Sequence, residues 1–191
     1  MKVTREQAAQ NRERIVDTAA RLFREKGFDG IGVADLMKTA GLTHGGFYGH
    51  FESKEALLAE AAGRALDGAG AGWQALMDAN PDDPLGAVAR SYLSPAHRDN
   101  PGLGCAIAAL GADIARAGPA VRDAVTARTR AQLDALAGAA PGDTDGDKRR
   151  NAIAGYAAMI GGLVLARAVA DPALSEEILD AVAASANRGH R

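Results

Sequence analysis

The chain has 191 residues and a formal charge of only −2, so it is long enough to bury a core and is not a polycation that would coat nucleic acid indiscriminately. A single cysteine, Cys105, excludes an intrachain disulfide framework and suits a reducing cytoplasm. The N-terminal residues lack the apolar core of a secretory signal.

The first predicted helix begins at Thr4 and stops near Gly27. Thr4 and Gln7 have the spacing of a capping box, which marks a helix N-terminus. The apolar residues that follow recur on one face: Ile15, Ala19, Leu22 and Phe23. We expect this helix to brace the segment that comes after it.

Residues 33–54 carry the pattern around which the chain is organised. Four apolar residues recur at the spacing of one helix face: Val33, Leu36, Met37 and Ala40. Gly41 ends that helix, because glycine tolerates the left-handed conformation that follows a last turn. Thr43 is expected to cap a second short helix, whose buried side carries Phe47 and Phe51. Such a helix-turn-helix places its second helix in the DNA major groove.

Three features of this segment occur together and in order: the small-residue turn, the FYxHF sequence that ends at Phe51, and the SKExL sequence that starts at Ser53. With residues 15–23 upstream, they resemble the DNA-binding region of TetR-type transcriptional regulators over roughly the first third of the chain. The resemblance implies an all-helical homodimer that binds a near-palindromic DNA operator. It also implies release of the operator when a small-molecule inducer enters the C-terminal domain.

The predicted DNA contacts lie on the second helix and at the start of the next one: Thr43, His44, Gly45, Gly46, Tyr48, His50 and Lys54. The first turn of a recognition helix meets base edges in this docking geometry. The resemblance implies that Tyr48 contacts the DNA backbone or a thymine methyl group and that His50 and Lys54 contact phosphates. A cation at a helix N-terminus opposes the helix dipole, which favours a phosphate role for Lys54. The alternative for Tyr48 is simple packing against Phe51.

The second helix is unusually rich in glycine. Gly45, Gly46 and Gly49 each cost about 1 kcal/mol relative to alanine in a helix interior. We therefore expect this helix to stay loose until DNA orders it.

Helical periodicity continues to the C-terminus without strand alternation. A long helix from Ser53 to about Asp78 is expected to belong to both halves of the molecule, and Asp83-Pro84 is expected to start the next. The segment 94–104 is expected to be a loop and the segment 138–147 to be disordered; the remaining helices are predicted at about 105–117, 119–137, 147–170 and 172–186. The result is an all-α fold of about nine helices, with a DNA-binding domain over residues 1–60 and a ligand-binding and dimerisation domain over residues 61–191.

The predicted helix at about residues 147–170 is apolar on two faces. One face and the following helix are predicted to form a four-helix dimer core through Ile153, Ala157, Ile160, Val164, Ile178, Leu179 and Val182. The alternative is burial of both faces within one chain. The uncharged run 152–166 is shorter than the roughly 20 apolar residues of a membrane span, so a buried interface helix is favoured and no membrane partner is expected.

A ligand cavity is predicted around the aromatic residues of the C-terminal part, with eight candidate wall residues: Trp73, Met77, Tyr92, Leu103, Cys105, Leu110, Tyr156 and Met159. Few of its candidate walls carry charge, so the inducer is expected to be mainly apolar. For each aromatic ring the alternative is ordinary core packing, which is the commoner role of a large ring on an apolar helix face. An alternative function is thiol or electrophile sensing through Cys105 at a helix start, against which stands its role as a small apolar filler.

No catalytic set is recognisable. The four histidines lack metal-ligand spacing with Cys105 or with paired acids, and no cofactor motif is present. We therefore predict neither an enzyme nor a bound cofactor. The remaining alternative is a helical protein-interaction module without DNA binding, in which Tyr48, His50 and Lys54 would be incidental.

Overall fold

The computed structural model describes residues 4–187, and every regular element among them is helical. In chain order the α-helices and 3-10 helices (η) are α1 (Arg5–Lys26), α2 (Val33–Thr39), η1 (His44–Gly49), α3 (Lys54–Ala79), α4 (Pro84–Tyr92), α5 (Pro95–Asp99), η2 (Pro101–Leu103), α6 (Ala106–Arg116), α7 (Pro119–Ala139), α8 (Asp145–Ala168) and α9 (Pro172–Asn187). The predicted all-α class is confirmed.

Local capping chemistry fixes most helix boundaries. The side chains of Thr4, Ser53 and Asp83 each accept a hydrogen bond from the backbone N–H three residues further on, at 3.1, 3.0 and 3.1 Å. Gly27 and Gly41 follow α1 and α2 with φ angles of +78° and +71°, which only glycine adopts at little cost. These predicted starts and stops are confirmed.

The segment 94–104, expected to be a loop, instead contains α5 and η2. Ser94 caps α5 by accepting a hydrogen bond from the His97 N–H at 3.2 Å, and Pro95 occupies the first helical position. This is the same signal that Asp83-Pro84 provides for α4. The expectation of a loop is wrong because the segment's proline, glycine and charge concealed a capped start.

The segment 138–147, expected to be disordered, forms a tight turn that leads directly into α8. Thr144 and Asp147 make a reciprocal capping box, in which each side chain accepts a hydrogen bond from the other residue's backbone N–H at 3.1 Å. The helix thus begins with its orphan N–H groups satisfied, despite a composition typical of disorder.

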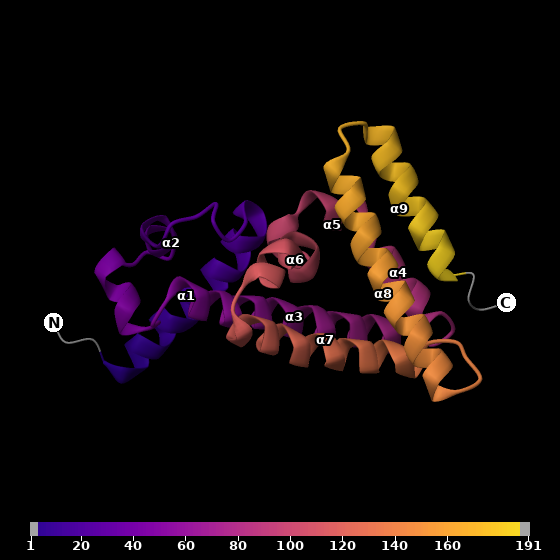
Figure 1. The fold of residues 1–191 in the computed structure, drawn as a ribbon, viewed down its shortest axis with the longest axis horizontal. Coiled ribbons are helices and arrows are strands. Elements are labelled where there is room, and N and C mark those ends of the chain that lie inside the picture. The colour runs from indigo at the N-terminus through magenta and orange to yellow at the C-terminus, as the bar shows by residue number, and fades with distance from the viewer. Residues whose placement is uncertain (1–3, 188–191) are drawn as a thin grey trace.

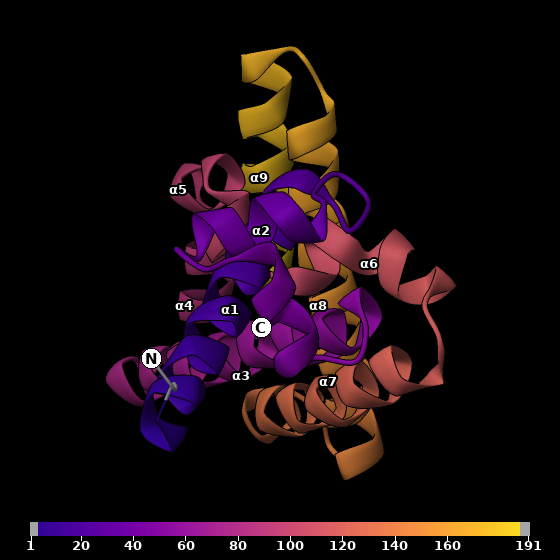
Figure 2. The ribbon, with the colours of Figure 1, turned by 90° about the vertical axis from the view of Figure 1, so that its left-hand side faces the viewer.

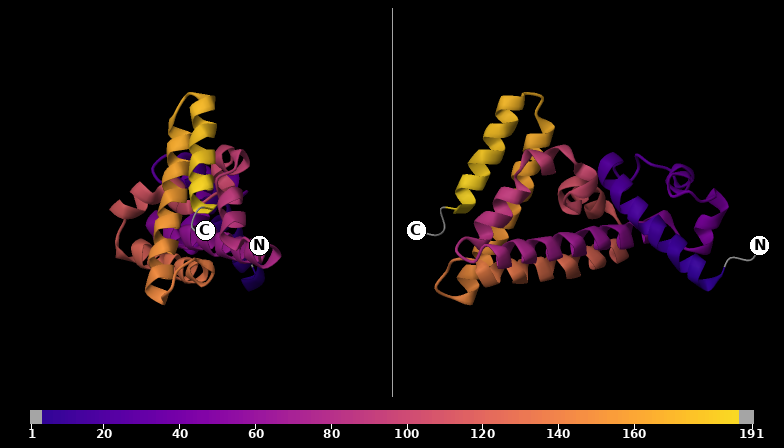
Figure 3. Two further views of the ribbon diagram at one scale, coloured as in Figure 1. Left: turned by 90° about the vertical axis from the view of Figure 1, so that its right-hand side faces the viewer. Right: turned by 180° about the vertical axis from the view of Figure 1, so that it is seen from behind.

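The molecule is elongated, with α1 and α2 at one end and α8 and α9 at the other (Figure 1). Viewed along its length, α1 and α2 lie in front of the C-terminal helices (Figure 2). The long helices α3 and α7 run side by side, and α8 and α9 stand across their far end (Figure 3). Because α3 spans most of this length, it joins the two ends mechanically.

Two hydrophobic cores share α3. The N-terminal core contains Phe23, Phe47 and Leu57, each fully buried, and extends to residues of α6 and the start of α7. The C-terminal core contains Trp73 and neighbouring apolar residues of α4, α7, α8 and α9. The division at residue 60 remains a prediction about function, since the N-terminal core continues along α3 as far as Leu66.

A buried glutamine ties three helices together in the C-terminal part. Gln132 on α7 donates to the Leu66 carbonyl on α3 at 2.8 Å and accepts from the Tyr156 hydroxyl on α8 at 3.0 Å. Both polar ends of the Gln132 amide are thereby satisfied inside the core. By length and hydropathy α8 could also span a bilayer, but one face of it packs into this core.

Candidate functional site

The helix-turn-helix presents one side of η1 to solvent and anchors the other. Phe47 is fully buried beneath η1, and its ring lies 5.7 Å from the ring of Phe51, centroid to centroid. Tyr48, in contrast, is 68% exposed, although its edge contacts Phe47. Its ring and hydroxyl therefore face outward beside His44, which is also exposed.

The recognition segment η1 is a 3-10 helix, and the Thr43 hydroxyl makes no capping hydrogen bond, contrary to the expected N-cap. A Cβ atom added at Gly45 or Gly49 would meet no other atom within 4 Å, and one added at Gly46 would make only ordinary contacts at 3.6 and 3.7 Å. None of these glycines has a φ in the left-handed region. The fold itself therefore does not require glycine at these three positions.

Lys54 has a structural partner that the sequence did not reveal. Its ammonium donates to the Phe28 carbonyl and lies 4.4 Å from the centroid of the Phe28 ring. The cation thus closes the connection between α1 and α2, which gives its place at a helix N-terminus a structural reason. His50 is half-buried at the C-cap of η1, where its backbone N–H donates to the Phe47 carbonyl at 2.9 Å.

Ion pairs fasten α1 to α3. Arg64 on α3 reaches Glu13 at 2.6 Å and Asp17 at 2.7 Å, and Arg12 on α1 pairs with Glu60. The hydrogen bond to Glu13 is the main cause that raises the pKa of Arg64 above its ordinary value. These ion pairs hold α1, the helix that braces the helix-turn-helix, on α3.

The predicted ligand-binding residues divide between two cavities. The first, the α3–η2 cavity, has a volume of about 530 Å³ and includes Trp73, Tyr92, Leu103 and Cys105 in its wall. The second, the α8–α9 cavity, has about 550 Å³ and includes Tyr156 and Met159. Two residues line neither cavity: Met77, which packs in the C-terminal core, and Leu110, which packs in the N-terminal core.

An aromatic cluster joins wall residues of the two cavities. The ring of Trp73 meets the rings of Tyr92 and Tyr156 edge to face, with centroids 6.0 and 5.2 Å away. The Tyr156 hydroxyl is satisfied by Gln132, whereas the buried Tyr92 hydroxyl has only the weakly bonding Cys105 thiol beside it. Burial raises the pKa of Tyr92 well above its ordinary value, and the neighbouring Cys105 thiol adds to the rise.

Cys105 is only 4% exposed, so it offers an oxidant little direct access. Its burial among apolar residues favours the filler role over the thiol-sensing alternative.

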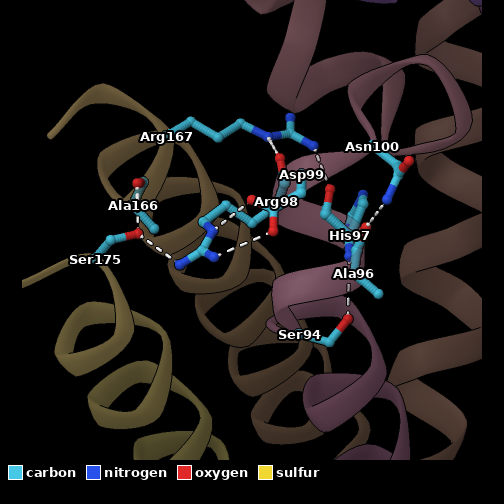
Figure 4. A network of polar contacts seen from close by, with 9 residues as sticks. All are labelled: Ser94, Ala96, His97, Arg98, Asp99, Asn100, Ala166, Arg167 and Ser175. Atoms are coloured by element: carbon cyan, nitrogen blue, oxygen red, sulfur yellow. Dashed lines mark hydrogen bonds and ion pairs between the residues drawn. The ribbon is translucent and has the colours of Figure 1, made fainter. Parts of the chain in front are cut away.

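Hydrogen bonds hold the α5–η2 segment, residues 95–103, from both sides, and we call this set of contacts the His97 clamp. The His97 Nε2 accepts from the Cys105 N–H at 2.9 Å, so the proton resides on Nδ1, which donates to the Tyr92 carbonyl at 2.6 Å. On the other side Arg167 of α8 donates to the carbonyls of His97 and Arg98 at 2.6 and 3.0 Å (Figure 4). These contacts join the end of α4, α5, the start of α6 and α8.

The clamp extends in two directions. Arg98 donates to the Ser175 hydroxyl at 3.0 Å, and that hydroxyl donates to the Ala166 carbonyl at 2.7 Å, which secures the α8–α9 turn (Figure 4). At the opposite end Arg24 of α1 donates through Nε to the Gly102 carbonyl of η2 at 3.0 Å. Polar contacts therefore link α8 and α9 to the α5–η2 segment, and that segment to α1, without passing through α3.

The predicted dimer residues fall into exposed and internal groups. Ile153 and Val164 are 46% and 42% exposed, Ala157 is also exposed, and Ile160 is half-buried. Residues of α9 face inward: Leu179 is 1% exposed, and Ile178 and Val182 pack against the C-terminal core. A Cβ at Gly162 would lie 3.0 Å from Val182, so Gly162 allows α9 of the same chain to approach.

Together these features define a helix-turn-helix fold of the DNA-binding class: α2 and η1 are joined by a glycine turn, braced by α1, and expose an aromatic face. Among the described residues no group of three His, Cys, Asp or Glu side chains is placed to hold a metal ion. The family model "Bacterial regulatory proteins, tetR family" matches residues 15–61. Residues 15–61 are thus a DNA-binding domain of the TetR family of helix-turn-helix transcriptional regulators.

Individual comparisons agree with that assignment. The HTH-type transcriptional regulator YerO of Bacillus subtilis is 44% identical over 52 residues, 27% of this chain and 18% of its own length. The reduced form of Escherichia coli NemR has the same fold, with a TM-score of 0.78 over 94% of this chain and 96% of that chain at 23% identity. SCO4454, a TetR-family regulator of Streptomyces coelicolor, has a TM-score of 0.67 and 26% identity over 96% of this chain and 97% of its own. This chain spans only 18% to 35% of the lengths of three curated relatives that it matches.

The His97 clamp generates a prediction about pH. Burial lowers the pKa of His97 from its ordinary value of about 6.5, and the nearby Arg167 and Arg24 lower it further against the opposing effect of the Tyr92 carbonyl. Below about pH 6.5 the unfolded chain then binds a proton that the folded chain does not, so this contribution to stability is lost as pH falls. We expect urea unfolding between pH 7.5 and 5.5 to show a steeper loss of stability for the wild type than for His97→Gln.

The exposed His44 provides the matched control. His44→Gln should follow the pH dependence of the wild type, because this side chain lies in solvent. An identical pH profile for His97→Gln and the wild type would contradict the role assigned to the clamp.

Proposed function

We propose that this protein is a cytoplasmic, homodimeric transcriptional repressor that binds a near-palindromic operator and releases it when a mainly apolar small molecule occupies the C-terminal part. The observation that carries the proposal is the construction of η1. Its inner side is fixed by the buried Phe47, whereas His44 and Tyr48 are presented outward on a fold of the DNA-binding class.

Different residues on the exposed side of η1 would contact different parts of the DNA. Thr43, His44 and the backbone of Gly45 and Gly46 would meet base edges, and Tyr48 would contact a thymine methyl group or the sugar-phosphate backbone. His50 and Lys54 would contact phosphates. For Lys54 this means that its ammonium would turn from the Phe28 carbonyl, or serve both, when the operator binds.

The exposure of Tyr48 also weighs against a protein-interaction module in which the aromatic residue merely packs. A ring that is 68% exposed adds little to the core beyond its edge contact with Phe47. This exposure leaves the ring free to contact duplex DNA.

Dimerisation is proposed through the outer face of α8. Ile153, Ala157 and Val164 are exposed there within the uncharged run 152–166, and a Cβ at Gly161 would meet nothing within 4 Å. Such a face suits close approach of a second helix in an isologous four-helix contact. In this proposal Leu179 supports the interface from inside the chain, while Ile160, Ile178 and Val182 lie at its margin.

Release of DNA is proposed to use two routes from the α3–η2 cavity. A ligand there would press on α3 through Trp73 and on η2 through Leu103. Both elements reach the N-terminal part: α3 continues into the core that holds Phe47 of η1, and η2 is bonded to α1, the helix that braces the helix-turn-helix, through Gly102 and Arg24. A shift of either one changes the separation of the two recognition segments in a dimer, which the duplex fixes.

Gly45→Ala tests close approach to DNA. Because the added Cβ meets no atom of the free protein, the substitution should stabilise η1 by up to about 1 kcal/mol. Operator affinity should nevertheless fall about tenfold, because the methyl group would stand between the backbone and the base edges. Thermal unfolding and fluorescence anisotropy with operator DNA would measure the two effects.

Gly68→Ala is the matched control, since Gly68 is exposed on α3 and its Cβ would likewise meet nothing within 4 Å. It should raise stability and leave operator binding unchanged. Equal operator affinity for Gly45→Ala and the wild type would contradict the proposed approach of η1 to DNA.

Val164→Glu tests the dimer interface. A carboxylate on the outer face of α8 would be buried unpaired in a dimer but solvated in a monomer, so we expect the protein to become monomeric at micromolar concentration. Analytical ultracentrifugation would measure this, with Ala71→Glu on the exposed side of α3 as the control that stays dimeric. A monomeric wild type would refute the arrangement.

A further inference from the structure

Arg14 of α1 lies beside the turn of the helix-turn-helix. A Cβ atom added at Gly41 would be 3.8 Å from Nη1 of Arg14, so the guanidinium lies against the turn between α2 and η1. This is the C-terminal end of α2, where the helix dipole favours a cation. The helix α1 therefore brings a positive charge to the point at which the chain enters η1.

The charge of Arg14 is not neutralised within the protein. Its side chain is exposed, and its only side-chain hydrogen bond among the described residues goes from Nη2 to the amide oxygen of Asn11 at 3.2 Å. The ion pairs of α1 in the described part of the chain use other arginines. Because a guanidinium has five N–H donors, most donors of Arg14 remain available to a further acceptor.

The N-terminal part as a whole offers little general attraction to DNA. Residues 4–64 carry nine Lys or Arg and nine Asp or Glu side chains, so their formal charges cancel. Several of the cations are also engaged inside the protein: Arg12 pairs with Glu60, and the ammonium of Lys54 donates to the Phe28 carbonyl. Attraction of a polyanion therefore depends on individual cations that are both unpaired and close to η1, and Arg14 meets both conditions.

The docking geometry of a helix-turn-helix places the turn near phosphates. The first helix of the motif crosses the sugar-phosphate backbone, and the start of the second helix meets base edges. The turn between them consequently lies where the DNA backbone borders the major groove. A guanidinium held beside that turn is within reach of a phosphate, to which an arginine can donate two parallel N–H bonds.

We infer that Arg14 binds a DNA phosphate, a contact outside the helix-turn-helix segment that it can make without breaking an ion pair. Lys54 differs, because its ammonium would have to leave or share the Phe28 carbonyl. The inference rests on the proposed function for the docking of η1 in the major groove. A phosphate contact carries no base preference, so Arg14 should strengthen binding to operator and non-operator duplexes alike.

The salt dependence of DNA binding tests the inference. Fluorescence anisotropy would measure the affinities of the wild type and Arg14→Gln for a selected operator and for a scrambled duplex of the same length, from about 50 to 300 mM salt. Loss of one phosphate contact should reduce the slope of log affinity against log salt by about 0.9. It should also weaken binding to both duplexes by about eightfold at 0.1 M salt.

Arg130 on α7 provides the matched control. It is also an exposed arginine, the ion pairs of α7 among the described residues do not include it, and α7 lies away from α2 (Figure 1). Arg130→Gln should keep the wild-type slope and affinity, whereas Arg14→Lys, which retains the charge, should recover most of the slope. The unfolding midpoint of Arg14→Gln should stay close to that of the wild type, because the hydrogen bond that it loses is exposed.

An unchanged slope for Arg14→Gln would overturn the inference, as would an equal reduction in Arg130→Gln or a loss confined to the operator. The proposed function fails in a different way. A wild type that binds the operator and the scrambled duplex equally would refute sequence-specific regulation, whatever the slope of Arg14→Gln. A wild type that forms no complex with either duplex would refute both.

Discussion

The burial of α3 in both hydrophobic cores is the constraint on which the rest of the structure depends. Leu57 anchors one end in the core beneath η1, and Trp73 anchors the other beside the α3–η2 cavity. The two residues are separated by about 24 Å of continuous helix. Neither core can shift along this helix without disturbing the other, because ion pairs to α1 and the Gln132 bridge hold its flanks.

The α5–η2 segment provides a second mechanical connection that is independent of α3. It is short and depends on side-chain bonds to backbone carbonyls, from Arg24 on one side and Arg167 on the other. Such contacts are directional, so a displacement of the segment breaks them rather than stretching them. The helix α3 and the α5–η2 segment both border the α3–η2 cavity. A small molecule bound there would therefore have two ways to act on η1.

Local sequence patterns predicted what depends on neighbours in the chain. The caps at Thr4, Ser53 and Asp83 and the buried Phe47 could be recognised from spacing alone. The Ser94-Pro95 start was available as a signal but was hidden by the composition around it.

Pairings across the fold could not be predicted. The Gln132 bond to Tyr156, the Arg24 bond to Gly102 and the two-sided engagement of His97 join residues that no periodicity connects. The separation of the predicted pocket residues into two cavities likewise depends on how whole helices pack, with Leu110 drawn into the other core.

The central claim is that η1 reads a symmetric DNA site, and selection of bound duplexes from a random pool tests it most directly. We expect enrichment of a near-palindromic sequence whose half-sites lie about one helical turn apart, with affinity falling steeply as salt increases. Tyr48→Ala should lose that enrichment while remaining folded, because the side chain is exposed. A wild-type pool without any enriched sequence, at low and at physiological salt, would contradict the account.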